Sequence, residues 1–91
     1  IYPVEVEEVL QSHPKIYDAA VIGMPDERLG EVVAAVIDPK PGEKLTEEDV
    51  MLFCEQNLPR YKRPRHIFFD KVPRNPTGKI EKPKLRQKYA T

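Results

Sequence analysis

The residue best suited to chemistry is a lysine at the end of a proline-rich segment. Lys79 closes the run Pro73-Arg74-Asn75-Pro76-Thr77-Gly78-Lys79, in which a Gly-Lys pair follows an expected strand. A phosphate-binding P-loop would need Gly five residues before Gly78 and Ser or Thr after Lys79, but Pro73 and Ile80 stand there. We interpret the run as a stiff loop in which Gly78 removes bulk beside one lysine. By composition alone, a lysine with no chemical role is the commoner outcome.

Basic residues concentrate in the last third of the chain. Residues 1–58 contain 13 acidic and 4 basic residues, whereas residues 59–91 contain 2 acidic and 11 basic ones, so net charges of −9 and +9 cancel. Such a basic region attracts the phosphates of a nucleotide, a coenzyme or a nucleic acid. The alternative is a solvated face that pairs with the acidic one. Phe68 and Phe69 would point to opposite faces of a strand, which disfavours an RNA-stacking sheet.

The composition indicates one globular domain without a metal site of its own. A chain of 91 residues, 40% hydrophobic and 33% charged, can close around a single core. Its apolar runs are far shorter than the roughly 20 residues that a membrane span needs, and it opens with no signal segment. We therefore expect a cytoplasmic protein. The lone cysteine, Cys54, has no disulfide partner and no neighbouring ligands, so we expect a small core residue.

Hydrophobic periodicity predicts the elements that must position these residues. The expected order is helix (3–13), strand (17–23), strand (31–38), helix (47–58), strand (66–72), loop and helix (83–88). Thr46, followed by three acidic residues, marks the start of the second helix, and Pro59 marks its end. The first two strands are close enough in sequence to pair antiparallel. The fold class is therefore α+β: a small single domain with a short β-sheet, about three strands plus a hairpin, flanked by helices.

Four segments together resemble one enzyme family. They are residues 1–7, residues 19–26 with Gly30-Glu31, Tyr61-Lys62-Arg63-Pro64, and residues 73–79. In this order and spacing they are similar to the C-terminal domain of AMP-forming acyl-CoA synthetases, in the luciferase-like superfamily of adenylate-forming enzymes. The resemblance spans almost the whole chain, which begins without Met. We therefore expect residues 1–91 to be the mobile lid domain of a ligase whose larger N-terminal domain lies outside this sequence.

The resemblance implies a role for particular residues. Lys79 matches the lysine that assists adenylation of the acyl carboxylate, with Pro73, Thr77 and Gly78 in its supporting loop. Tyr61, Arg63 and Arg65 match a stretch that lies near coenzyme A in the thioester-forming step. We expect residues 23–31 to be a turn fixed by its acidic residues, and the glutamates of the first helix to be solvated.

The resemblance also implies substrates and partners. ATP and coenzyme A would be substrates, with Mg²⁺ in the full-length enzyme and a carboxylic acid, a fatty acid by our leaning, as the acyl donor. The N-terminal domain would be the partner, against which this domain rotates between two half-reactions. The isolated fragment should be inactive. Two alternatives stay open: the lid of a carrier-protein-loading or luciferase-like enzyme, and a nucleic-acid-binding module.

Overall fold

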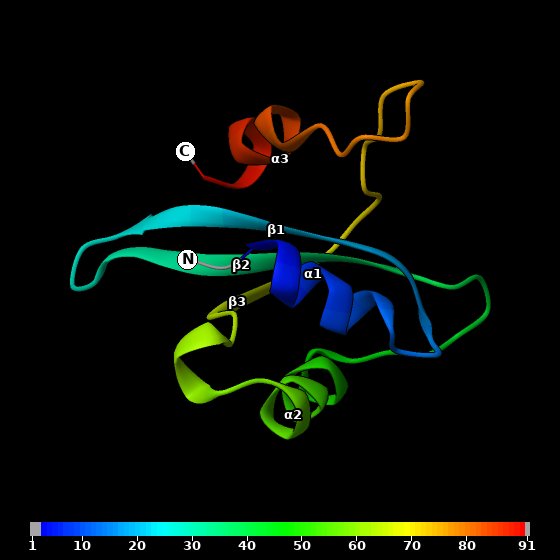
Figure 1. Cartoon of the computed structure of the whole chain (residues 1–91), viewed down its shortest axis with the longest axis horizontal. Coiled ribbons are helices and arrows are strands. Elements are labelled where there is room, and N and C mark those ends of the chain that lie inside the picture. Colours follow the sequence, from blue (N-terminus) through cyan, green and yellow to red (C-terminus); the bar gives the residue numbers. More distant parts are fainter. Residues whose placement is uncertain (1–2, 91) are drawn as a thin grey trace.

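The computed structural model describes residues 3–90 and has three layers (Figure 1). A three-stranded sheet in the order β1-β2-β3 forms the middle layer. Helices α1 (Pro3–Gln11) and α2 (Glu47–Asn57) cover one face, and α3 (Lys82–Tyr89) covers the other. This arrangement confirms the expected α+β class and element order. Ile1 and Tyr2, which belong to the first segment of the resemblance, lie outside the described residues.

Strands β1 (Ile16–Asp26) and β2 (Gly30–Pro39) form the expected antiparallel hairpin, but both are longer than predicted. Residues 23–26, expected in the turn, continue β1 and pair with residues 30–33. Pro25 is tolerated there because β1 is an edge strand of the sheet. The actual turn spans residues 27–29. The Asp26 carboxylate accepts hydrogen bonds from the amides of Arg28 and Leu29, so an acid does fix it, as predicted.

Strand β3 (His66–Phe69) pairs parallel to β2 and ends three residues before its predicted end at Val72. Because parallel strands need a long connection, the chain crosses from β2 to β3 through α2 and a 3₁₀ turn, η1 (Arg60–Lys62). The short β3 leaves residues 70–81 free to cross from the sheet to α3. This crossing segment contains Lys79.

The helix boundaries follow from local chemistry. Thr46 and Asp49 form a reciprocal capping box at the start of α2, with hydrogen bonds of 3.1 and 3.0 Å, as Thr46 predicted. The helix ends before Leu58, the residue that precedes Pro59. Pro3 opens α1, which ends at Gln11, two residues earlier than expected.

Alternate residues of the strands divide the interior into two clusters. On one face, Leu10 of α1 and Cys54 of α2 pack against Val21 and Ile37. On the other face, Leu85 of α3 packs against Ala20, Ile22, Ala34 and Val36. Burial raises the pKa of the Cys54 thiol to about 11, in keeping with its predicted place in the core.

No helix in the described part of the chain is both long and apolar enough to cross a membrane.

Candidate functional site

The segment that contains Lys79 is a small hairpin of its own. Arg74 and Ile80 form an antiparallel bridge. The Asn75 amide donates to the Lys79 carbonyl at 2.9 Å, and the Glu81 amide donates to the Pro73 carbonyl at 2.8 Å. Ile80 packs into the cluster beneath α3. The predicted proline-rich loop is therefore ordered along both arms, and Lys79 leaves it just after the turn. We refer to residues 73–81 as the lysine hairpin.

The turn of the lysine hairpin is held by one side-chain oxygen. Asn75 Oδ1 accepts hydrogen bonds from the Thr77 amide at 3.0 Å, the Thr77 hydroxyl at 2.6 Å and the Lys79 amide at 3.0 Å. Gly78 adopts a φ of +89°, which L side chains rarely reach, yet a Cβ there would meet nothing within 4 Å. Within this domain, the need for glycine is therefore conformational and not the removal of bulk that the sequence predicted.

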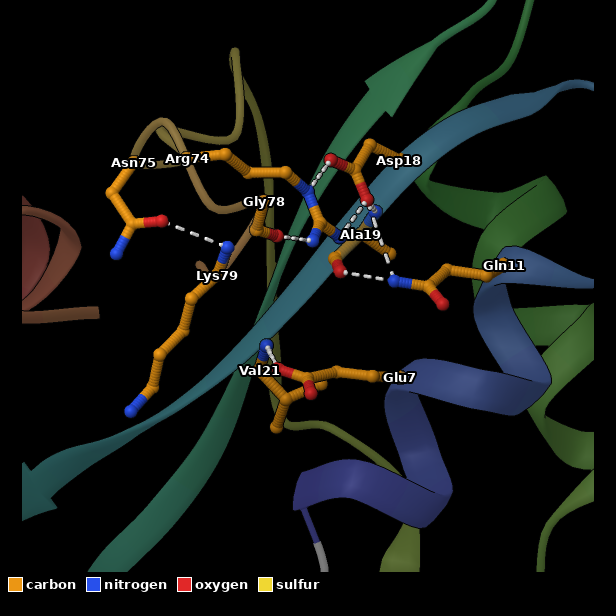
Figure 2. Close-up of polar contacts among 9 residues, drawn as sticks. All are labelled: Glu7, Gln11, Asp18, Ala19, Val21, Arg74, Asn75, Gly78 and Lys79. Carbon is orange, nitrogen blue, oxygen red and sulfur yellow. Dashed lines mark hydrogen bonds and ion pairs between the residues drawn. The ribbon is translucent and has the colours of Figure 1, made fainter. Parts of the chain in front are cut away.

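Arg74 fastens the lysine hairpin to the sheet. Its Nε and Nη2 atoms donate to the two carboxylate oxygens of Asp18 in β1, both at 2.8 Å, while Nη1 donates to the Gly78 carbonyl (Figure 2). Burial alone would raise the pKa of Asp18, but the hydrogen bonds from Arg74 and the Ala19 amide outweigh it, so the pKa lies below 3.8. The pair is therefore charged at neutral pH and joins the sheet to the turn.

The ammonium of Lys79 remains available for a ligand. The side chain is exposed and, among residues 3–90, forms no ion pair or hydrogen bond. Figure 2 shows it extending away from the Arg74–Asp18 pair. It lines a hollow with the apolar residues Val4, Ile80 and Pro83 and the charged residues Glu7, Arg74 and Lys82. A lysine beside an apolar hollow is suited to an anion that arrives from another domain.

Glu7 contradicts the expectation that the glutamates of the first helix are solvated. Its side chain is buried, and its Oε2 accepts the Val21 amide of β1 at 2.7 Å (Figure 2) and pairs with Lys82 of α3 at 2.9 Å. The Val21 amide belongs to the open edge of the sheet, where no neighbouring strand can accept its hydrogen bond. The Glu7 carboxylate is the acceptor instead. Glu5 forms an ion pair with Lys62 at 2.7 Å. Both glutamates therefore join α1 to other elements.

The predicted coenzyme A residues lie together in a second place. Tyr61, Arg63 and Arg65 line one groove with Leu29 and Glu31, between η1 and the far end of the β1–β2 hairpin. Tyr61 is 73% exposed, which suits contact with a partner or ligand. Arg65 is also exposed, and its backbone amide bonds the Val33 carbonyl at 2.8 Å. We call this the basic groove.

Arg63 is held differently from the other two residues. Its Nε donates to the Leu58 carbonyl at 3.0 Å and its Nη2 donates to the Glu55 carbonyl at 3.1 Å. These carbonyls belong to the C-terminal end of α2, where a helix lacks internal donors and favours a positive charge. The Arg63 guanidinium therefore caps a helix, a role that the sequence analysis did not assign.

The two places lie apart. In Figure 1 the lysine hairpin (orange) and η1 (yellow-green) lie on opposite sides of the sheet and towards opposite ends of its long axis. The structure thus places Lys79 and the three predicted coenzyme A residues at two separate places. It adds Arg74, Asn75 and Asp18, which had no assigned role. Arg74-Asn75 stood in the quoted segment, but the sequence did not reveal the link to Asp18, 56 residues away.

Comparison with known proteins gives this geometry a context. The family model described as "AMP-binding enzyme C-terminal domain" matches residues 5–79. One relative is a propanoyl:CoA ligase of Rhodococcus jostii, whose acyl group bears a methyl-dioxo-octahydroindenyl ring. It is 48% identical to this chain, and the match covers 96% of this chain and 17% of the length of the relative. The fatty acid–acyl-carrier-protein ligase ScoC of Streptomyces coeruleorubidus is 43% identical over 98% of this chain and 17% of its own.

A solved structure agrees with the sequence matches. The fatty acyl CoA synthetase of Mycobacterium tuberculosis has a TM-score of 0.89 at 42% identity, covering 98% of this chain and 18% of that one. This chain thus spans about a sixth of the length of the relatives it matches. The family match, the identities and the shared fold lead to one conclusion: the chain belongs to the family of C-terminal domains of AMP-binding enzymes, as found in AMP-forming acyl-CoA synthetases.

Proposed function

We propose that this chain acts as the C-terminal lid domain of an ATP-dependent, AMP-forming acyl-CoA ligase and supplies Lys79 for adenylation. The observation that carries the proposal is the exposed ammonium of Lys79, which has no partner among the described residues. It extends from a hairpin that hydrogen bonds fix at its turn and to β1. A lysine kept only for solubility would not need this support.

In the first half-reaction, a substrate carboxylate oxygen attacks the α-phosphorus of ATP and pyrophosphate leaves, which forms an acyl-adenylate. Negative charge increases on the α-phosphate as the bond forms. The Lys79 ammonium, carried into a site formed mainly by the N-terminal domain, would stabilise that charge and the attacking carboxylate. The hollow beside Lys79 has apolar side chains from Val4, Ile80 and Pro83, which would limit water around the ammonium and strengthen its effect.

In the second half-reaction, the thiol of coenzyme A loses its proton to water and its sulfur attacks the acyl carbonyl, and AMP leaves with the electron pair of the broken bond. The basic groove is suited to the phosphates of coenzyme A, because Arg65 is exposed and Tyr61 presents an exposed ring. Since the lysine hairpin and η1, which forms part of the groove, lie on opposite sides of the sheet, rotation of the whole domain would present the two places in turn.

The described residues do not fit a magnesium site. No three His, Cys, Asp or Glu side chains within residues 3–90 converge where they could hold a metal ion. We propose that Mg²⁺ reaches the enzyme with the phosphates of ATP. We propose that the enzyme is cytoplasmic. We also favour a fatty acid as the acyl donor, because the similar mycobacterial structure is named a fatty acyl CoA synthetase.

A carrier protein is the alternative acceptor. The 43% identical relative from Streptomyces coeruleorubidus is named as an acyl-carrier-protein ligase, so this domain type serves that acceptor too. Thioester formation with coenzyme A and with a holo carrier protein, compared on the full-length enzyme, separates the two. A nucleic-acid-binding module has less support, because Phe68 stacks on Tyr89 beneath α3 instead of lining an open sheet face.

The test uses the full-length enzyme with Lys79→Ala. Acyl-adenylate formation should fall about 10²- to 10³-fold, whereas thioester formation from supplied acyl-adenylate should persist. Lys71→Ala is the matched control, since Lys71 is exposed on the same connecting segment outside the lysine hairpin. If Lys79→Ala behaved like Lys71→Ala in both half-reactions, Lys79 would be an ordinary surface lysine. ATP–pyrophosphate exchange by the isolated 91 residues would contradict the lid role.

A further inference from the structure

We propose that Asp18 and Arg74 are positioning residues that set where Lys79 stands, an inference that rests on the proposed adenylation role of Lys79. Neither side chain is assigned contact with a substrate. Their effect would pass through the backbone of the lysine hairpin, from which the Lys79 side chain emerges. Asp18 belongs to β1, so the pair would fix the position of Lys79 relative to the sheet.

The contacts of Arg74 reach three points at once. Two nitrogens bind both Asp18 oxygens at 2.8 Å, and the third binds the carbonyl of Gly78, the residue directly before Lys79. Arg74 itself lies on the first arm of the hairpin, opposite Ile80. The guanidinium therefore joins the first arm, the turn and the sheet. A planar fork can do this, whereas the single ammonium of a lysine at position 74 cannot keep the same geometry.

The Asp18 carboxylate is largely buried and is held by donors other than Arg74. Its side chain is only 13% exposed, against 38% for Arg74. Asp18 Oδ1 also accepts from the Ala19 amide at 3.0 Å and from Gln11 of α1 at 3.3 Å. The carboxylate is thus fixed by contacts with β1 and α1 as well as by Arg74. A fixed acceptor transmits position better than a mobile surface carboxylate does.

A charge role and a purely stabilising role for this pair predict different results from positioning. If Arg74 acted on the nucleotide through its charge, Arg74→Lys would retain most activity, and Asp18→Asn would not impair adenylation. If the pair only stabilised the fold, both half-reactions would decline together. Positioning predicts that Arg74→Lys and Asp18→Asn each impair adenylation alone, because each breaks the bidentate contact while the positive charge at position 74 remains.

The experiment measures both half-reactions in the full-length enzyme carrying either variant. Misplacement of a catalytic group by about 1 Å can cost up to about 10²-fold, so we expect adenylation to fall roughly 10- to 100-fold. Thioester formation from supplied acyl-adenylate should stay within about twofold. Asp70→Asn is the matched control. It breaks a carboxylate–cation pair with Lys88, 2.6 Å long, that fastens α3 and not the lysine hairpin, so it should not affect adenylation selectively.

Coupling to Lys79 gives the decisive measurement. In a Lys79→Ala background, Arg74→Lys should cause little further loss of adenylation, because no ammonium remains to be positioned. An undiminished loss in that background would overturn the inference, as would full adenylation activity in Asp18→Asn. If Lys79→Ala alone leaves adenylation intact, the proposed function fails first. If Lys79→Ala is impaired while both pair variants are active, only the positioning inference fails.

Discussion

Replacing Glu7 by Ala should destabilise the domain far more than a surface substitution in the same helix. The change removes the acceptor of the buried Val21 amide, and a hydrogen bond to a charged group contributes about 1.5–3 kcal/mol. It also removes the ion pair with Lys82, whose side chain is 23% exposed. This ion pair contributes at most about 1 kcal/mol to stability. The free energy of unfolding should therefore fall by about 2–4 kcal/mol.

Urea unfolding of the isolated domain, followed by far-ultraviolet circular dichroism, measures this loss. At about 4–8 °C per kcal/mol for a domain of this size, the melting temperature should fall by roughly 8–32 °C. Glu7→Gln keeps an acceptor for the Val21 amide and should lose about half as much. Glu8→Ala, at an exposed position of α1, should stay within about 0.5 kcal/mol. Equal effects of Glu7→Ala and Glu8→Ala would mean that the carboxylate is solvated.

Three further predictions concern backbone strain, pH and the basic groove. Gly78→Ala should cost about 1–2 kcal/mol and impair adenylation selectively in the full-length enzyme, whereas Gly42→Ala, at a φ of +78°, should cost stability alone. Hydrogen bonds from α3 lower the pKa of Asp70 from 3.8 to about 2, so the stability they confer should disappear as pH falls from about 4 to 2. Unfolding titrations of Asp70→Asn should lack this component, and an unchanged acid slope would contradict it. Arg65→Ala should raise the KM for coenzyme A without changing stability. Arg63→Ala should raise the KM and also lower the free energy of unfolding by about 0.5–1.5 kcal/mol in urea titrations. Identical behaviour of the two variants would refute the distinction.

Much of the fold could be predicted because it depends on local signals. The capping box at Thr46, the stop before Pro59 and the alternation of buried residues along β1 and β2 are each visible within a few residues of sequence. The ends of the strands could not be predicted in the same way. Pro25 suggests a turn, but it is accepted in β1 because that strand has a free edge, which only the tertiary arrangement determines.

The candidate site divides along the same line. Lys79 and three groove residues, Tyr61, Arg63 and Arg65, were predicted because their segments resemble a family, although their roles stay predictions. Asp18 and Glu7 were missed, because their partners lie far away in sequence: Arg74 in one case, and Val21 and Lys82 in the other. An acidic residue on a helix or strand looks the same in sequence whether it is solvated or satisfies a buried donor.

The unbroken length of β1 has a consequence for ligand design. Asp18, at one end, holds the lysine hairpin, and Asp26, eight residues further along, lies beside Arg65 of the basic groove. At about 3.3 Å per residue, the strand keeps these points about 26 Å apart. A ligand much shorter than about 26 Å should therefore contact the lysine hairpin or the basic groove, but not both at once. Its affinity should not gain the avidity expected from two simultaneous contacts with this domain.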